Sequence, residues 1–151
     1  MTDPATDFDD FYAAERVGLL RLAWLLTGSG DDAADVVNEA FATVWERWAR
    51  VENPAGYVRV CVVHEVRRRQ RRRALERRVL GRQRERVSGP PEDPLADALA
   101  ALPPAQRAVV VLRFYEDRNE AEIAELLGVA PGTVKSRLHR GLSRLREDID
   151  R

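Results

Sequence analysis

The chain of 151 residues is 44% hydrophobic and 33% charged, which is the composition of a folded globular protein with room for one or two small domains. Its single cysteine, Cys61, excludes an internal disulfide framework and a cysteine-rich zinc site, and we interpret it as a small core residue. No segment reaches the roughly 18 consecutive apolar residues of a membrane span, and the acidic start MTDPATDFDD is unlike a secretory signal, so we expect a cytoplasmic protein that does not insert into membranes.

Charged residues are unevenly distributed along the chain, although the formal net charge is zero. Residues 1–56 contain 4 basic and 11 acidic side chains, whereas residues 57–89 contain 12 basic and 3 acidic ones. This polarity indicates two kinds of partner, one for the acidic part and one for the basic part.

Two helices are predicted before residue 50. Apolar residues recur at helical spacing from Phe8 to Leu26, and the segment TGSG at 27–30 ends the first helix. The second helix is expected to begin near Asp31 and Asp32, because acidic residues suit a helix N-terminus. The apolar residues on its buried stripe are Val37, Ala40, Phe41, Val44 and Trp48. We interpret the tryptophans as core residues: Trp24, Trp45 and Trp48.

A third helix is predicted to start with Asn53 as N-cap and Pro54 at its first position. Its valine-rich segment YVRVCVVHEV also resembles a strand, but no other segment offers a strand to pair with, so we predict helix. From Arg67 the sequence continues as RRRQRRRALERR, in which no apolar face remains. We expect this stretch to be solvated or to lie against a polyanion.

The second half of the chain begins after the linker-like segment SGPPEDP at 88–94. Leu95, Leu99 and Leu102 predict a short helix, Pro103 and Pro104 restart the chain, and an apolar helix follows around residues 109–115. The prediction is therefore an all-α fold of two small helical domains, residues 7–80 and 95–149, joined by a linker at 81–94.

Residues 119–140, NEAEIAELLGVAPGTVKSRLHR, have the pattern of a helix-turn-helix. Gly128 lies where the first helix must end, and we expect it to have positive φ. The second helix is basic, as is typical of a helix that enters the major groove of DNA. A solvated amphipathic hairpin is the alternative, although Lys135, Arg137 and Arg140 lie in early turns, where cations oppose the helix dipole and therefore favour a DNA role.

An acidic stripe is predicted on the outer side of the second helix. Asp35, Glu39 and Glu46 share this stripe with Ala42, and like charges four residues apart destabilise an isolated helix by about 0.2–0.5 kcal/mol. Either a partner outside the helix uses these carboxylates, or they form a solvated face with the usual N-terminal preference for acids.

Three segments occur in one order: AADVVNEAFATVWERW from residue 33, NPAGYVRVCVVHEVRRRQRRR from residue 53, and LPPAQRAVVVLRFYEDRNEAEIAELLGVAPGTVKSRLHRGLSRLRE from residue 102. Together they resemble conserved regions two and four of an extracytoplasmic-function sigma factor of the sigma-70 superfamily, of the kind common in actinobacteria. The resemblance implies a subunit without catalytic chemistry, cofactor or metal, which binds core RNA polymerase and directs promoter-specific initiation. It also implies an anti-sigma protein as a regulatory partner.

The resemblance also implies which residues bind polymerase. Asp35 and Glu39 correspond to the acids that bind the β′ clamp helices, and Asn38 stands between them where glutamine is usual. The helix that contains Val109 and Leu112 corresponds to the one that docks on the β-flap.

The resemblance places promoter binding on two further groups of residues. For the minus-ten element these are Asn53, Tyr57, His64, Arg67 and Arg68, with His64 where asparagine is usual. Melted single-stranded DNA suits such a set, because extruded bases need polar edges and planar faces and the backbone needs cations. For the minus-35 element they are Thr133, Lys135, Ser136, Arg137, His139 and Arg140. Ala130 replaces a capping serine, a loss of about 1 kcal/mol that Pro131 partly offsets.

Two other classes of protein are the alternatives. A stand-alone transcriptional regulator would share only the helix-turn-helix, and its front domain would serve dimerisation or sensing. A small helical enzyme is disfavoured because the sequence has no Ser-His-Asp grouping, no phosphate-binding glycine loop and no pair of histidines at ligand spacing.

Overall fold

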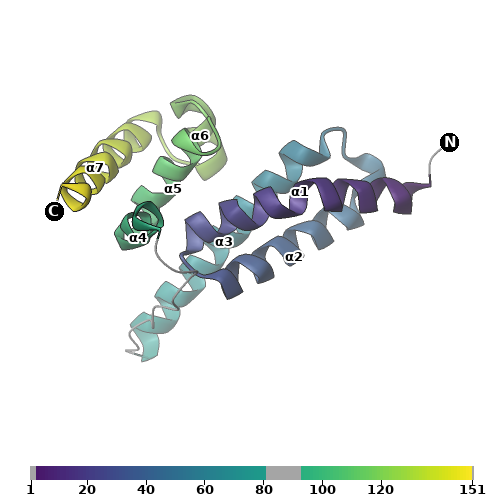
Figure 1. Cartoon of the computed structure of the whole chain (residues 1–151), viewed down its shortest axis with the longest axis horizontal. Helices are drawn as coiled ribbons and strands as arrows, with labels where there is room; N and C mark the ends of the chain where they lie inside the picture. The colour runs from purple at the N-terminus through teal and green to yellow at the C-terminus, as the bar shows by residue number, and fades with distance from the viewer. Residues whose placement is uncertain (1–2, 81–92, 151) are drawn as a thin grey trace. The chain divides into compact units, whose positions relative to one another are not determined.

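The computed structural model describes residues 3–80 and 93–150, which form two compact units. One unit contains residues 3–24 and 29–80, and the other contains residues 25–28 and 93–150. All regular structure within these described residues is helical (Figure 1), so the all-α prediction is confirmed. Residues 81–92 of the expected linker lie outside the described residues, and the domain boundaries stay a prediction.

The first unit is built from three long helices. These are α1 (Pro4–Thr27), α2 (Gly30–Glu46) and α3 (Pro54–Leu80), with a short 3-10 helix, η1 (Trp48–Arg50), between the last two. Its core is formed by fully buried aliphatic side chains from all three: Leu19, Leu22, Val36, Val37, Val44, Val58, Val62 and Val63. Each such side chain contributes about 1.5–3 kcal/mol by burial. The valine-rich segment thus faces the core as a helix, as predicted.

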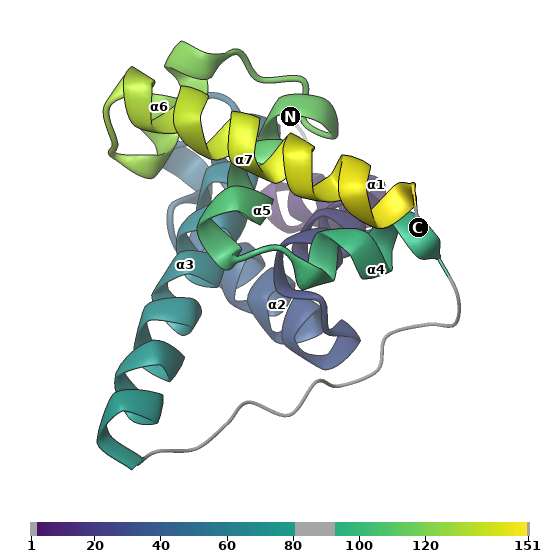
Figure 2. The ribbon, with the colours of Figure 1, turned by 90° about the vertical axis from the view of Figure 1, so that its left-hand side faces the viewer.

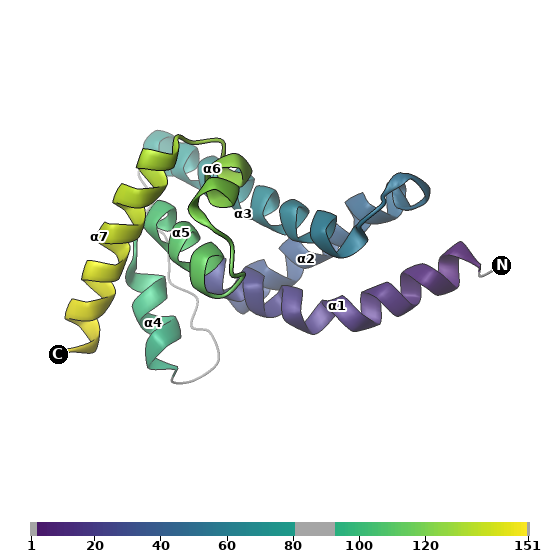
Figure 3. The ribbon, with the colours of Figure 1, turned by 90° about the horizontal axis from the view of Figure 1, so that it is seen from above.

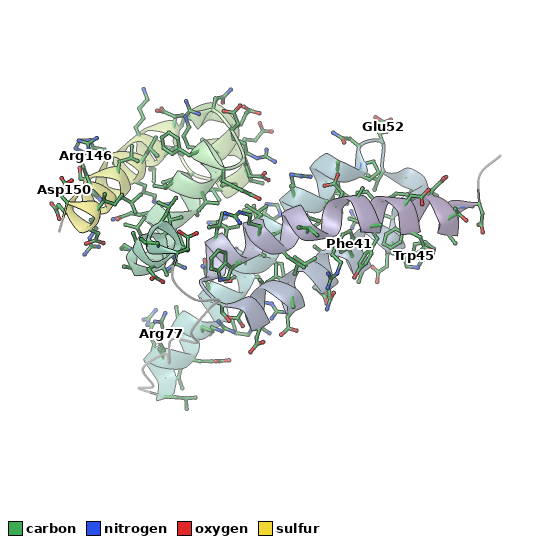
Figure 4. The ribbon with its side chains drawn as sticks, in the orientation of Figure 1. Phe41, Trp45, Glu52, Arg77, Arg146 and Asp150 are labelled. Carbon is green, nitrogen blue, oxygen red and sulfur yellow. The ribbon has the colours of Figure 1, made fainter. Side chains whose placement is uncertain are left out.

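An aromatic cluster closes one end of this core, between α1 and α2. Phe8 packs edge-on against Phe41 and Trp45, at centroid distances of 6.2 and 4.9 Å. Figure 4 shows Phe41 and Trp45 together at this end of α2. The core assignment was wrong for Trp45, whose side chain is about half exposed because it lies toward the solvent side of α2. Trp48 is half-buried and belongs to η1, so it does not extend the buried stripe of α2.

The boundaries of α1, α2 and α3 follow from local chemistry. Gly28 has φ of 73°, which lets the chain turn out of α1. Ser29 is the N-cap of α2 and its hydroxyl accepts a hydrogen bond from the backbone N–H of Asp32. At the start of α3, Asn53 accepts a bond from the N–H of Gly56 at 3.2 Å, as predicted for an N-cap followed by proline.

The second unit packs four helices: α4 (Pro94–Ala101), α5 (Pro104–Phe114), α6 (Glu120–Leu127) and α7 (Pro131–Ile149). Figures 2 and 3 show α7 beside α5 and connected to α6 by a short turn. The core of this unit includes Val109, Leu112, Ile123 and Val134, all fully buried. Arg107 is also buried, and its guanidinium donates hydrogen bonds to carbonyl groups at the end of α4, including those of Leu99 and Leu102.

A transmembrane segment requires a long helix of apolar residues, and the part of the chain that the structure describes contains none.

Candidate nucleic-acid and partner interfaces

The predicted acidic stripe on α2 faces solvent. Asp35, Asn38 and Glu39 are all exposed, while Val36, Val37 and Ala40 on the opposite side are buried. Ala42 and Glu46 continue the exposed side toward the C-terminal end of the helix. The stripe is therefore accessible to a partner along most of α2.

The acids of α2 also have partners within the chain. Arg73 of α3 pairs with Asp32, and Arg69 of α3 lies 3.8 Å from Asp35. Because the later residue on α3 meets the earlier one on α2, the two helices are antiparallel. The arginine-rich stretch was expected to be solvated or against a polyanion, and that expectation was incomplete: its first turns lie against the carboxylates of α2. The last turn of α3, where Figure 4 labels Arg77, is exposed.

Glu65 is a buried acid that the sequence pattern did not single out. Its carboxylate accepts hydrogen bonds from Arg68 at 2.9 Å and from Arg69 at 2.9 Å. Burial by itself raises the pKa of this carboxyl, but the hydrogen bonds and charges of the two arginines outweigh burial and hold the pKa below its usual value. An acid placed three and four residues before two arginines on one helix was the available signal.

The minus-ten candidates share one side of the start of α3. Asn53 and Tyr57 line an open cavity of about 690 Å³, together with residues of η1 and the end of α2. His64 and Arg68 lie about two and three helical turns beyond Tyr57 on the same side of α3, and both are exposed, whereas Arg67 is half-buried. By helical spacing, these five predicted residues lie along one side of α3 and the turn before it.

Cys61 lies on the same helix and is half-buried, so the core assignment was only partly correct. Burial raises the pKa of its thiol, and this outweighs a hydrogen bond with Tyr57 and the nearby charge of Arg47. A thiol with a raised pKa stays protonated near neutral pH, which agrees with a packing role rather than with nucleophilic chemistry.

The helix-turn-helix is formed by α6, the turn at 128–130 and α7. Gly128 has φ of 67°, as predicted. A capping box holds the start of α6: Asn119 accepts from the N–H of Glu122 at 2.8 Å, and the Glu122 carboxylate accepts from the N–H of Asn119 at 3.1 Å. Ala130 occupies the N-cap of α7 without a side-chain bond, as its sequence predicts.

The minus-35 candidates lie in the first turns of α7. Lys135, Ser136, His139 and Arg140 are exposed, while Thr133 and Arg137 are half-buried. The Ser136 hydroxyl donates to the carbonyl of Gly132 at 3.0 Å, and the Lys135 ammonium lies 3.9 Å from the Glu120 carboxylate. The other side of α7 contributes Val134 and Leu145 to the core, so the candidates lie on the side of the helix away from the core.

The two residues expected to dock on a flap are placed differently. Val109 and Leu112 are fully buried in the core of the second unit, so direct contact with a partner is not available to them. The exposed apolar side chains at the end of the same helix are Phe114 and Tyr115, and the Arg113 guanidinium lies 5.5 Å from the centre of the Phe114 ring. Helical periodicity alone did not distinguish the inner side of this almost wholly apolar helix from its outer side.

Comparison with known proteins agrees with this layout. Residues 11–76 match the family described as Sigma-70 region 2, and residues 92–145 match Sigma-70, region 4. The RNA polymerase sigma-E factor of Streptomyces coelicolor is 34% identical over 95% of this chain and 86% of its own length. The chain belongs to the sigma-70 superfamily, as an extracytoplasmic-function RNA polymerase sigma factor.

Other relatives support the same family. The ECF RNA polymerase sigma factor SigL of Mycobacterium tuberculosis is 35% identical, with 85% of this chain and 80% of that protein covered. A solved structure of the sigma factor RpoE with the anti-sigma factor NepR from Bartonella quintana has a TM-score of 0.79, at 24% identity over 95% of this chain and 97% of that one. That likeness shows the shared fold. The match of both regions disfavours a stand-alone regulator, because such a protein would share the helix-turn-helix alone.

Proposed function

We propose that this sigma factor binds core RNA polymerase through the exposed stripe of α2, contacts the minus-ten element with α3 and reads the minus-35 element with α7. The observation that carries the proposal is the position of Asp35, Asn38 and Glu39, which form one exposed stripe on a helix whose other side is core. In this family the equivalent stripe binds the β′ clamp helices. A cationic partner would relieve the repulsion between neighbouring carboxylates.

The surface of α3 suits melted DNA. The cavity beside Asn53 and Tyr57 offers an amide edge and an aromatic ring, which are the groups that bind an unstacked base. His64 and Arg68 follow along the exposed side and would contact the next nucleotides and the backbone. The acidic stripe that we propose for polymerase binding lies on a different helix, α2, so the first unit can bind polymerase and DNA at the same time.

The exposed side of α7 suits duplex DNA. Arg137 and Arg140 carry forked guanidinium groups that can bond guanine in a bidentate way, whereas contacts to phosphate position the helix without specifying sequence. Thr133, Lys135, Ser136 and His139 complete the groove-facing set. Phe114 replaces Val109 and Leu112 as the proposed contact of α5 with the β-flap, because this apolar residue is 60% exposed.

Two properties are proposed from the family alone. The protein would act in the cytoplasm, where core polymerase and the chromosome are found. An anti-sigma protein would bind it, as the NepR protein binds its sigma factor in the solved complex.

Run-off transcription with purified bacterial core polymerase tests the proposal. Fragmented genomic DNA from the source organism supplies the templates, and the recovered transcripts define the promoter. We expect discrete start sites that require both core enzyme and this protein. Absence of any dependent transcript, together with tight DNA binding by the protein without core, would contradict the proposal.

A further inference from the structure

Glu65 is the one acid in the buried core of the described residues, and two arginines bind it. Arg68 uses Nε at 3.1 Å from Oε2 and Nη2 at 2.9 Å from Oε1, and Arg69 uses Nε at 2.9 Å from Oε1. A buried carboxylate without such partners is strongly unfavourable. The arrangement therefore holds all three side chains in one geometry.

The guanidinium groups of Arg68 and Arg69 differ in exposure and in their other partners. The Arg69 side chain is only 23% exposed, and its Nη1 lies 3.8 Å from Asp35 on α2. The Arg68 side chain is 61% exposed, and its Nη1 has no hydrogen-bond partner among the described residues. Glu65 thus binds Nε and Nη2 of Arg68 and leaves Nη1 available to a partner outside the chain, although the charge of Glu39 on α2 also acts on this guanidinium.

An arginine that is already ordered binds DNA with a smaller entropic cost. A free arginine on an exposed helix samples many rotamers, and binding must then restrict them. The bidentate pair with Glu65 restricts the Arg68 side chain before DNA arrives. The hydrogen bonds to Glu65 also raise the pKa of Arg68 above its ordinary value, as expected for a guanidinium paired with a carboxylate.

We propose that Glu65 is a positioning residue of the minus-ten interface. It holds the Arg68 guanidinium with Nη1 directed outward, toward a phosphate or base of the melted promoter strand, and it turns Arg69 back toward Asp35. Glu65 itself does not touch DNA. This inference rests on the proposed DNA-binding role of α3.

The first test uses the full chain without DNA. Arginine side-chain NMR signals report whether guanidinium rotation is hindered, and Arg68→Lys assigns the signal of Arg68. We expect hindered rotation of Arg68 and Arg69 in the wild type, free rotation in Glu65→Gln, and no change in Glu76→Gln. Glu76 is an exposed acid on the same helix, so its substitution makes the same change in charge. Free rotation of Arg68 in the wild type would overturn the proposal.

The second test uses holoenzyme and the promoter recovered by run-off transcription. Loss of one charge-assisted contact weakens binding by about tenfold or more. We expect Arg68→Ala and Glu65→Gln each to have this effect, and the double variant to be no weaker than Arg68→Ala. In Glu65→Gln the Arg68 side chain can still reach its phosphate but must be ordered on binding, so the salt dependence should match that of the wild type, whereas Arg68→Ala lowers the slope by about one phosphate contact.

Several results would overturn the inference. Tighter binding by Glu65→Gln would show that Glu65 competes with DNA for Arg68, and additive losses in the double variant would show two independent effects. Promoter binding by Arg68→Ala that equals wild-type binding would overturn the inference as well. If Glu65→Gln does not fold, Arg68→Lys replaces it: an ammonium lacks the fork that pairs with Glu65, so this exposed variant should bind as weakly as Arg68→Ala. If the wild-type protein supports no run-off transcription, the proposed function fails as well. If the wild-type protein supports run-off transcription and one of the results above is obtained, only the inference about Glu65 is rejected.

Discussion

Arg73 of α3 binds Asp32 of α2 through two parallel hydrogen bonds, Nη1 to Oδ2 and Nη2 to Oδ1, each 2.6 Å long. The hydrogen bonds with Asp32 raise the pKa of Arg73 above its ordinary value. Asp32 also lies in the first turn of α2, where the helix dipole favours a negative charge. This pair therefore fastens the arginine-rich part of α3 to the start of α2.

Arg73→Ala should destabilise the first unit by about 1–2 kcal/mol, because the partly buried Asp32 loses a bidentate partner. Tryptophan fluorescence during urea unfolding measures this, since Trp24, Trp45 and Trp48 all lie in the first unit. Arg77→Ala, on the exposed end of α3, is the matched control and should change stability by less than about 0.5 kcal/mol. Equal free energies of unfolding for the two variants would show that the pair of Asp32 and Arg73 does not stabilise the first unit.

Glu65 should make the first unit sensitive to acid. Its pKa is lower in the folded protein than the ordinary value of 4.5, so the stability it contributes is fully present above that value and is lost as pH falls through the folded pKa. The difference in unfolding free energy between wild type and Glu65→Gln should be constant above about pH 5.5 and shrink below about pH 4.5. Urea titrations from pH 7 to pH 3 measure it, and a constant difference across this range would contradict the prediction.

Asp35→Arg should weaken binding to core polymerase by at least about tenfold, because it reverses an exposed charge on the partner-facing stripe. Its side chain is 66% exposed, so the substitution is compatible with folding. Fluorescence anisotropy of the labelled protein with core enzyme measures the affinity, and Asp10→Arg, at an exposed position of α1, controls for net charge.

Arg69→Ala distinguishes two possible roles of Asp35, direct contact with polymerase and the ion pair with Arg69 that joins α2 to α3. If Asp35 acts on polymerase directly, removal of its intramolecular partner should leave core affinity unchanged or slightly increased. If Arg69→Ala instead weakens core binding as much as Asp35→Arg does, the contribution of Asp35 is confined to the pairing of α2 with α3.

Arg140→Ala should weaken promoter binding by the holoenzyme and lower its salt dependence by about one counterion, as expected for a lost phosphate contact. Filter binding at several salt concentrations measures the slope. Arg146→Ala, on an exposed position near the end of α7 (Figure 4), should leave the slope unchanged. Weaker binding with an unaltered slope would assign Arg140 to base recognition instead.

Ala130→Ser should stabilise the second unit by about 0.5–1 kcal/mol, because it supplies the missing N-cap of α7. The backbone at Ala130 has φ of −69° and ψ of 148°, which is the conformation that capping residues adopt. Amide hydrogen exchange in the first turn of α7 measures the change, and unaltered protection there would show that Pro131 already compensates for the alanine.

Features that depend on neighbouring residues could be predicted from the amino-acid sequence. The N-cap at Asn53, the positive φ at Gly128 and the uncapped start of α7 involve residues no more than four positions apart, and all three were predicted correctly. The three ordered motifs likewise predicted the family. Local chemistry is sufficient for such features because each contact forms within one or two helical turns.

The face of each helix that is covered depends instead on tertiary packing. The pairing of Asp32 with Arg73 joins residues 41 positions apart, and it follows from the register in which α2 and α3 pack. The same packing buries Glu65, while packing in the second unit buries Val109 and leaves the neighbouring Phe114 exposed. Periodicity locates a stripe on a helix, but the side chains that cover the stripe come from distant parts of the chain.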